Sequence, residues 1–286
     1  MSHKTWLVTG ASSGLGTAIT ESALRAGHKV LATARNPAKA AAANPLIAEL
    51  GGIWISLDVT QPETTRYVER AIRENGGSID VLVNNAGYSL LGSIEDMSEA
   101  EIEAQFSTNL FGPIRVLKGA LPFMRKQRSG TVVNVSSSAG FDAFPGCAMY
   151  AGSKFALEGM SESLAGELQP FGIRVLIAEP GIFRTNFLSA FVTPEAGMTE
   201  DYEGTSIEGM LHAFRASNGN QQGDPVKAAA RILEVVSGTG MGVGKENLLR
   251  LPLGPDCYDR FQAKCDSLQE NLLQMKEIAY STNIDI

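Results

Sequence analysis

From residue 5 to residue 178, short apolar runs alternate with longer segments of helical periodicity. The runs are continuously apolar, which is typical of strands in a parallel sheet that helices cover on both faces. One more such run precedes the last helical segment. The sequence therefore predicts an α/β fold with a seven-stranded parallel sheet, its strands at residues 5–9, 29–34, 53–57, 79–83, 131–135, 173–178 and 248–253.

Capping and helix-breaking residues mark several helices between these runs. Ser98 and Glu101 form a capping box that opens a long helix, which Pro113 and Pro122 should bend or interrupt. Gly27 stands where the C-cap of the first helix belongs. Further helices are predicted at residues 149–168, 225–236 and 256–279, and a short one should be interrupted at residues 44–45.

The periodicity weakens after residue 185, and the segment 186–224 is rich in Gly, Ser, Thr and Glu. A long irregular stretch in a compact domain is usually functional, so we expect a substrate lid here. No hydrophilic linker separates two parts of the 286-residue chain. The prediction is a single domain over residues 1–286, with a C-terminal helical extension over residues 254–286.

The composition argues against several functional classes. The 24 Lys and Arg and 31 Asp and Glu residues give a net charge of −7, which disfavours binding to nucleic acid or anionic membranes. No segment approaches the roughly 20 apolar residues of a membrane span, and we expect no signal peptide. The three cysteines and three histidines lack metal-ligand spacing, which favours a reduced, cytoplasmic compartment and predicts no metal site.

A glycine-rich turn, TGASSGLG at residues 9–16, follows the first strand and opens the first helix. Such a turn lets backbone N–H groups approach a pyrophosphate at a helix N-terminus, where the helix dipole favours anions. The spacing differs from the usual dinucleotide pattern, so a turn without binding function is the alternative. Its place between strand and helix favours binding, with candidate contacts at Gly10, Ser12, Ser13, Gly14, Leu15 and Gly16.

The second strand ends in Thr33-Ala34-Arg35 and carries no acidic residue there. A carboxylate at this place would bind the adenosine ribose and repel a 2′-phosphate. The planar guanidinium of Arg35 suits a phosphate instead, and Ser13 could add a hydroxyl. The residues predict NADP(H) rather than NAD(H) as the cofactor; a solvated surface charge is the alternative for Arg35.

Tyr150 and Lys154 stand four residues apart, which places a phenol and an ammonium on one helix face. A phenol with a pKa of about 10 is a poor base at neutral pH. A neighbouring cation stabilises the phenolate, so the pair suits proton transfer, although a surface pair is the alternative. The sequence NVSSS at residues 134–138 ends the fifth strand, at the edge where open α/β sheets bind ligands.

These features together resemble the short-chain dehydrogenase/reductase family. The resemblance rests on five motifs in register: residues 9–16, NNAG at 84–87, the serines at 136–138, Tyr150 with Lys154, and Pro180-Gly181. It covers nearly the whole chain and implies a Rossmann-type doubly wound domain. YAGSKFALEGMSESLAGEL (150–168), FGIRVLIAEPGIFRTNF (171–187) and RLPLG (250–254) resemble the hydroxysteroid-dehydrogenase-like branch of the family.

The resemblance implies four catalytic residues. Tyr150 would exchange a proton with the substrate oxygen, and Lys154 would hold the nicotinamide ribose and lower the pKa of the tyrosine. The family serine stands thirteen residues before the tyrosine, which selects Ser137 over Ser138 as the group that polarises the carbonyl. Asn109 matches the asparagine that anchors a water beside the lysine.

The resemblance also implies cofactor contacts. Asp58 would meet the adenine amino group, although a helix N-cap is the alternative for it. The turn at residues 180–185 would hold the carboxamide and the pyrophosphate, although a plain turn is the alternative there. The full set of these contacts is Asp58, Val59, Asn85, Ala86, Gly87, Pro180, Gly181, Ile182 and Thr185, together with Tyr150 and Lys154.

The reaction implied by the family is hydride transfer between nicotinamide and the carbon of a ketone or secondary alcohol, with Tyr150 as acid/base. Apolar residues after Gly87, at 138–149 and in the lid predict a lipophilic substrate such as a steroid, polyketide or terpenoid. The alternatives are a lyase, epimerase or cyclase on the same fold, and a non-catalytic dinucleotide-sensing protein. Family members associate through the helices holding Asn109 and Tyr150, so a homodimer or homotetramer is expected.

Overall fold

The computed structural model describes residues 3–284. Its seven strands form one sheet in the order β3-β2-β1-β4-β5-β6-β7, and every neighbouring pair is parallel. The predicted seven-stranded parallel sheet is therefore confirmed, with strand ends within two residues of those expected. The strands are β1 (Thr5–Val8), β2 (Lys29–Ala34), β3 (Ile53–Ser56), β4 (Val81–Asn84), β5 (Gly130–Val135), β6 (Ile173–Pro180) and β7 (Arg250–Leu253).

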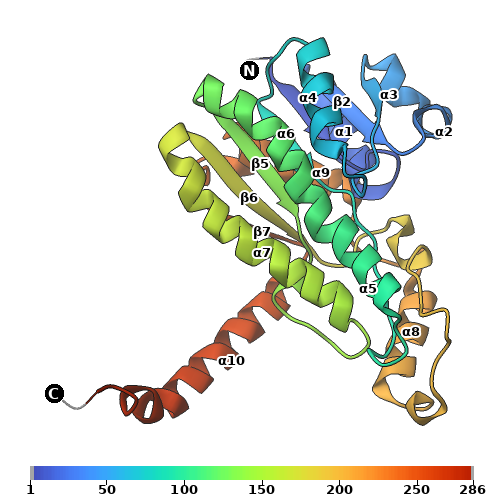
Figure 1. Cartoon of the computed structure of the whole chain (residues 1–286), viewed down its shortest axis with the longest axis vertical. Helices are drawn as coiled ribbons and strands as arrows, with labels where there is room; N and C mark the ends of the chain where they lie inside the picture. The colour runs from blue at the N-terminus through green and yellow to red at the C-terminus, as the bar shows by residue number, and fades with distance from the viewer. Residues whose placement is uncertain (1–2, 285–286) are drawn as a thin grey trace.

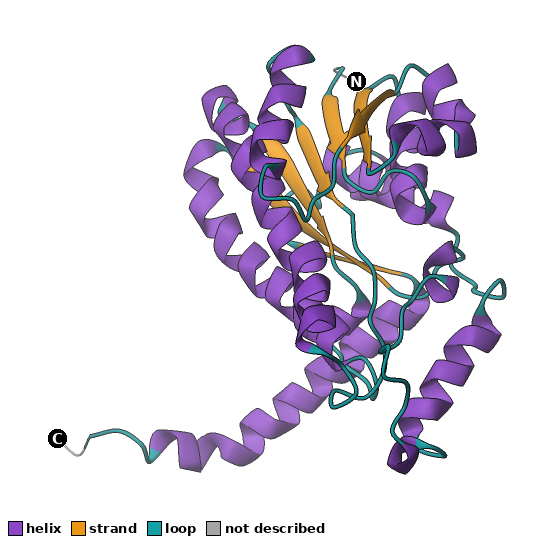
Figure 2. Cartoon of the chain, turned by 45° about the vertical axis from the view of Figure 1, so that its right-hand side comes forward, coloured by secondary structure: helices purple, strands orange, loops and turns teal. Residues whose placement is uncertain are grey.

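Helices cover both faces of this sheet, as Figure 2 shows. On one face, α1 (Gly14–Arg25) and α9 (Pro225–Ser237) bury an apolar core against alternate strand residues such as Trp6 and Val8. On the other face, α4 (Thr64–Glu74), α6 (Gly112–Gln127) and α7 (Ala148–Leu168) bury the opposite residues, such as Leu7. Both faces of each strand are buried, which explains the continuous apolar runs in the sequence.

The strand order reverses between β1 and β4, because the chain first builds outward to β3 and then returns to the other side of β1. Open α/β sheets bind ligands at such a switch point, at the carboxyl ends of the strands. The short helices α2 (Pro37–Ala43) and α3 (Pro45–Glu49) follow β2 and are separated at Asn44, as the sequence predicted.

The long helix predicted from residue 98 is three segments. The capping box at Ser98 opens α5 (Glu99–Phe106), a π-helical turn (Ser107–Phe111) follows, and α6 continues the chain. Pro113 explains the interruption, because it has no N–H to donate to the carbonyl of Asn109 one turn earlier. Single π turns of this kind are frequent at functional sites.

The segment after β6 contains more structure than its sequence suggested. It includes α8 (Ser206–Ser217), which Thr205 caps by accepting a hydrogen bond from the Ile207 N–H. Leu211 is the one buried residue of α8. Because so little of the helix is apolar and buried, the helical periodicity of its sequence is weak. The segment that the sequence predicted to be irregular thus contains a helix.

The last helix, α10 (Pro255–Tyr280), begins against the sheet and then extends away from the body (Figure 1). The sequence predicted a closing helix over residues 256–279. The helix forms, but most of its residues are exposed and do not pack on the rest of the described chain. Among residues 3–284, no helix is both long and apolar enough to cross a membrane.

Candidate active site

The glycine-rich turn after β1 is closely packed against the end of β4. Gly10 has a φ of +65°, and a Cβ placed on it would lie 2.9 Å from the Cα of Ala86. A Cβ on Gly16 would overlap the Gly10 carbonyl. The turn therefore needs glycine at these positions, and the N-terminus of α1 stays open to an anion. Its residues fit a dinucleotide pyrophosphate.

Serines and a threonine border this turn. Ser13 is the N-cap of α1, yet its exposed side chain makes no capping hydrogen bond and so remains available to a ligand. Leu15 instead packs partly against the sheet core, while Ser12 is exposed. Thr185, at the start of the lid, lies beside Gly14: a Cβ on Gly14 would be 3.2 Å from the Thr185 Cβ. The structure thus brings the predicted residues of the turn and of the lid together.

Arg35 and Asp58 lie at the same edge of the sheet, after β2 and β3. Asp58 Oδ1 accepts hydrogen bonds from the N–H of Thr60 at 3.0 Å and its hydroxyl at 2.7 Å. Burial alone would raise the pKa of Asp58, but these hydrogen bonds and the nearby charge of Arg35 lower it overall. Asp58 is therefore ionised at neutral pH, and Val59 beside it contacts Gly112 in α6.

Tyr150 and Lys154 lie on one face of α7, as their spacing predicted, and both are buried. The tyrosine hydroxyl hydrogen-bonds with Ser137, and Lys154 Nζ is 6.0 Å from the centre of the tyrosine ring. The same Nζ donates to the carbonyl of Val135 at 2.8 Å, which holds the lysine against the end of β5. Three of the four predicted catalytic groups are thus in one cluster.

The three consecutive serines after β5 have three different partners. Ser136 donates to Glu158 Oε1 at 2.6 Å, and Ser138 accepts from Arg260 Nη1 at 3.0 Å. Ser137 accepts from the N–H of Ala139 and faces Tyr150. Only Ser137 combines contact with the tyrosine and partial exposure, since the two flanking serines are buried.

Asn109 lies in the π turn and connects three elements. Its amide Nδ2 donates to the Tyr88 carbonyl and to Ser153 Oγ, both at 3.0 Å, and its Oδ1 accepts from the Tyr88 N–H at 3.2 Å. A Cβ on Gly87 would lie 3.2 Å from Asn109 Oδ1 and 3.7 Å from Lys154 Nζ. The absence of a side chain at Gly87 therefore keeps the space beside the lysine open.

Burial sets the protonation of the two central groups. It raises the pKa of Tyr150 from 10.0 to about 12, and the hydrogen bond with Ser137 offsets only part of this. It lowers the pKa of Lys154 from 10.5 to about 8, against the opposing effect of Glu158. At neutral pH the phenol is protonated and the amine is mostly charged. The lowered tyrosine pKa expected from the sequence is not found, because loss of water around the phenol is the larger effect.

The lid covers Tyr150 with apolar side chains. The ring centres of Phe187 and Tyr150 are 5.8 Å apart, and Leu211 of α8 is buried in the same cluster. The cluster also includes Leu91, Ala139, Cys147, Ala151, Phe144, Phe191, Met198, Ile207, Met210 and Phe214. Phe183, just before the lid segment, packs with the sheet core and is not part of this cluster.

Two further observations concern the lid segment. The lid is attached to the body through Asp96, which accepts hydrogen bonds from the N–H and hydroxyl of Thr199. An open depression of 260 Å³ lies within the lid segment itself, lined by Leu188, Ser189, Phe191, Thr193, Arg215 and Asn218. None of the predicted catalytic groups lines it.

Sequence reasoning missed several residues that hold the site in place. Thr9 Oγ1 accepts from the N–H groups of Asn85 and Ala86, and so fixes the end of β4 to the end of β1. Asp256 accepts from the Ile182 N–H at 2.8 Å and packs against Gly181, which fixes the turn after Pro180. Thr9 stood in a quoted motif and could have been found; Asp256, 74 residues from its partner, could not.

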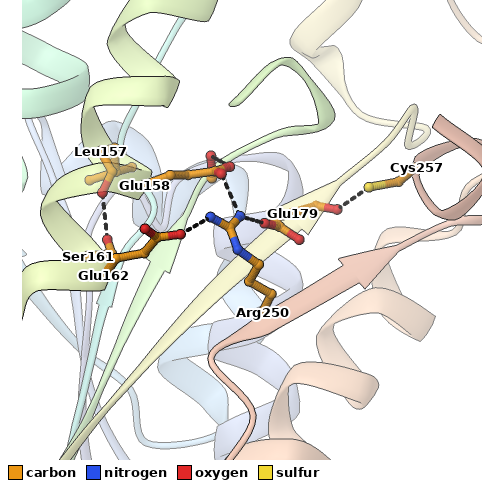
Figure 3. Close-up of polar contacts among 8 residues, drawn as sticks. Leu157, Glu158, Ser161, Glu162, Glu179, Arg250 and Cys257 are labelled. Atoms are coloured by element: carbon orange, nitrogen blue, oxygen red, sulfur yellow. Dashed lines mark hydrogen bonds and ion pairs between the residues drawn. The ribbon is translucent and has the colours of Figure 1, made fainter. Parts of the chain in front are cut away.

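A charge cluster lies between α7, which carries Tyr150 and Lys154, and strands β6 and β7 (Figure 3). Arg250 of β7 contacts the carboxylates of Glu158 and Glu162 on α7 and of Glu179 on β6. Glu158 and Glu179 are buried, whereas half of the Glu162 side chain is exposed. The cluster joins the helix that carries Tyr150 to the last two strands of the sheet.

The comparisons with known proteins decide the family. A family model described as short chain dehydrogenase matches residues 4–196. The chain belongs to this family. It is similar to oxidoreductase claN of Passalora fulva, with 50% identity over 208 residues that cover 72% of this chain and 94% of the relative. It is also 33% identical to 3-ketodihydrosphingosine reductase of Bacteroides thetaiotaomicron, with 94% of each chain covered. The protein is therefore a short-chain oxidoreductase.

Solved structures of family members agree with the fold. A short-chain dehydrogenase from Streptomyces avermitilis is 39% identical, with a TM-score of 0.86 and coverage of 99% of this chain and 100% of that one. One from Burkholderia phymatum in complex with NAD has the same fold, at 21% identity, TM-score 0.80 and coverage of 94% and 95%. A metagenomic oxidoreductase in complex with NADP is 33% identical, at TM-score 0.60 and coverage of 64% and 85%. Structural neighbours thus bind either nicotinamide dinucleotide.

Proposed function

We propose that this protein is an NADP(H)-dependent oxidoreductase that transfers a hydride between nicotinamide and a lipophilic ketone or secondary alcohol. The observation that carries the proposal is the enclosure of Tyr150. Its hydroxyl meets Ser137, the Lys154 ammonium is close to its ring, and apolar lid residues exclude water from it. The bound nicotinamide would supply the hydride.

In this proposal Ser137 and Tyr150 donate hydrogen bonds to the carbonyl oxygen of a ketone. Tyr150 is protonated at neutral pH, so it can give a proton to that oxygen as negative charge develops. The Lys154 ammonium stabilises the phenolate that remains, because a cation near a phenolate lowers its energy. These roles favour reduction of a ketone over oxidation of an alcohol at neutral pH.

The class of substrate follows from the side chains packed around Tyr150. They are apolar and aromatic, while the nearby cations Lys154 and Arg260 already contact the Val135 carbonyl and Asp142. Such a lining favours apolar molecules. The name of the relative 3-ketodihydrosphingosine reductase supports a lipophilic ketone. We propose a steroid, polyketide or terpenoid ketone as the substrate. We also propose that the protein is a member of the hydroxysteroid-dehydrogenase-like branch.

The cofactor preference follows from Arg35, which directly follows β2; the end of that strand itself carries no acidic residue. The holding roles proposed for Asn85, Ala86, Gly87, Pro180, Gly181, Ile182 and Thr185 agree with their places at the carboxyl edge of the sheet. We further infer a cytoplasmic homodimer or homotetramer.

The test is a panel of lipophilic cyclic ketones and small charged ketoacids, followed through NADPH oxidation. We expect turnover of the lipophilic ketones only. Tyr150→Phe should lower kcat by about 100-fold to 10,000-fold while NADPH still binds, because the proton donor is lost and the cofactor site is intact. Tyr67→Phe, an exposed tyrosine on α4, is the control and should match the wild type.

Three results would overturn the proposal. Turnover confined to charged ketoacids would contradict the apolar site. Full activity of Tyr150→Phe would contradict the role of the phenol. Conversion of substrate without net consumption of NADPH would indicate a lyase, epimerase or cyclase instead.

A further inference from the structure

The outer part of α10 has no packing partner within the chain. Every residue from 265 to 280 is exposed, and this part extends beyond the body in both views (Figures 1 and 2). A helix of this length is only marginally stable alone in water, since most helical stability in proteins comes from packing of an apolar face. A partner that covered the apolar side chains of this part would therefore stabilise it.

The side chains of α10 form a regular apolar stripe. It consists of Phe261, Cys265, Leu268, Leu272, Met275 and Ala279, spaced alternately four and three residues apart. Leu268, Leu272 and Met275 are 52%, 68% and 52% exposed. A repeat of 3.5 residues is typical of a helix that packs along another helix, rather than one lying in a groove of irregular shape.

The stripe continues a face that is already packed on this chain. Phe261 contacts the ring of Phe141 edge-on, with centres 4.6 Å apart, and Cys257, one turn earlier, is fully buried. Beyond Phe261 the body ends, while the same face of the helix goes on uncovered. The uncovered stripe is thus an extension of an existing packing surface.

The charges around the stripe indicate which partner fits. At 100° per residue, Asp266, Glu270 and Glu277 fall on the face opposite the stripe, while Lys264, Gln269, Asn271 and Lys276 flank it. Two copies can therefore approach along the stripe without bringing acidic groups together. The polar face opposite the stripe is acidic, so the segment lacks the Lys- and Arg-rich polar face of a membrane-surface helix.

We propose that the stripe on α10 is a self-association surface on which a second copy of this chain packs its own α10. Equal stripes related by a two-fold axis give a closed pair in which each helix covers the other. This contact is separate from the helices that hold Asn109 and Tyr150, and it depends on no assignment of the reaction.

The test compares the mass in solution of the full-length wild type with that of the double variant Leu268→Glu/Leu272→Glu, by sedimentation equilibrium at several concentrations. We expect the wild type to be an even multiple of 30.4 kDa and the double variant to have half the wild-type mass. Leu273→Glu is the matched control: Leu273 is 64% exposed but points away from the stripe, so this variant should keep the wild-type mass. Circular dichroism should show that all three proteins are folded.

Each other outcome overturns the proposal. A monomeric wild type, an unchanged mass for the double variant, or an equal loss of mass in Leu273→Glu would show that the stripe does not pair two copies. A flotation assay with phosphatidylcholine–phosphatidylserine vesicles covers the membrane alternative. Vesicle binding by the wild type that is lost in the double variant would replace the second copy by a lipid surface.

Discussion

At the scale of single residues, Arg35 is a charge without a partner at the edge where a nucleotide would bind. It directly follows β2 and has an exposed side chain, and no ion pair or hydrogen bond engages it among residues 3–284. The neighbouring Asp58 hydrogen-bonds with Thr60 and forms no salt bridge with Arg35 among these residues. An unpaired guanidinium in this place is suited to the extra phosphate of NADP(H).

Arg35→Ala should therefore weaken NADPH binding and leave NADH binding nearly unchanged. Loss of a charge-assisted hydrogen bond of about 1.5–3 kcal/mol corresponds to a Kd for NADPH raised roughly 10-fold to 100-fold. Fluorescence titration with each dinucleotide measures both constants. Lys39→Ala, an exposed cation in α2, is the control. An equal weakening for NADH, or none for NADPH, would remove Arg35 from the 2′-phosphate site.

At the scale of elements, local patterns predicted the strands and most helices, because each apolar run is buried on both faces. They did not predict the π turn around Asn109, since the sequence signal from Pro113 indicates only an interruption. They also missed α8, whose core-facing side fully buries one leucine. Contacts such as that of Arg260 with Asp142, 118 residues away, have no local pattern at all.

Arg260 connects the first turns of α10 to the loop after the candidate catalytic serine. Its Nε donates to Asp142 Oδ2 at 2.8 Å and its Nη1 to Ser138 Oγ at 3.0 Å, and the guanidinium lies over the ring of Phe144. Arg260→Met should lower kcat/KM for the preferred ketone by about 10-fold to 100-fold, because small misplacements of catalytic groups are costly. Arg231→Met, which breaks a pair with Glu234 in α9 and a contact with the Met241 sulfur, both remote from Tyr150 in the chain, should leave kcat/KM unchanged. Equal values for Arg260→Met and the wild type would contradict this positioning role.

At the scale of the whole molecule, the cluster around Arg250 joins α7, β6 and β7, and Cys257 of α10 donates to the carbonyl of Glu179 in the same place. One guanidinium serves three carboxylates, and Glu179 Oε2 is buried without a hydrogen-bond partner among the described residues. Burial, followed by the charge of Glu158, raises the pKa of Glu179 from 4.5 to about 7 despite Arg250. The folded protein therefore holds a proton on Glu179 that the unfolded chain loses at a lower pH.

Between pH 4.5 and about 7 the folded state thus binds more protons at Glu179 than the unfolded state, so this group makes the free energy of unfolding fall as the pH rises. The full effect is on the order of 3 kcal/mol. His28, whose pKa burial lowers, gives a slope of opposite sign in part of this range, so the informative quantity is the difference between variant and wild type. Glu179→Gln should remove the falling contribution, which thermal unfolding at pH 5, 6, 7 and 8 would measure as a gain over the wild type that grows with pH. A constant difference across this range would mean that Glu179 stays ionised, because Arg250 then compensates its burial in full.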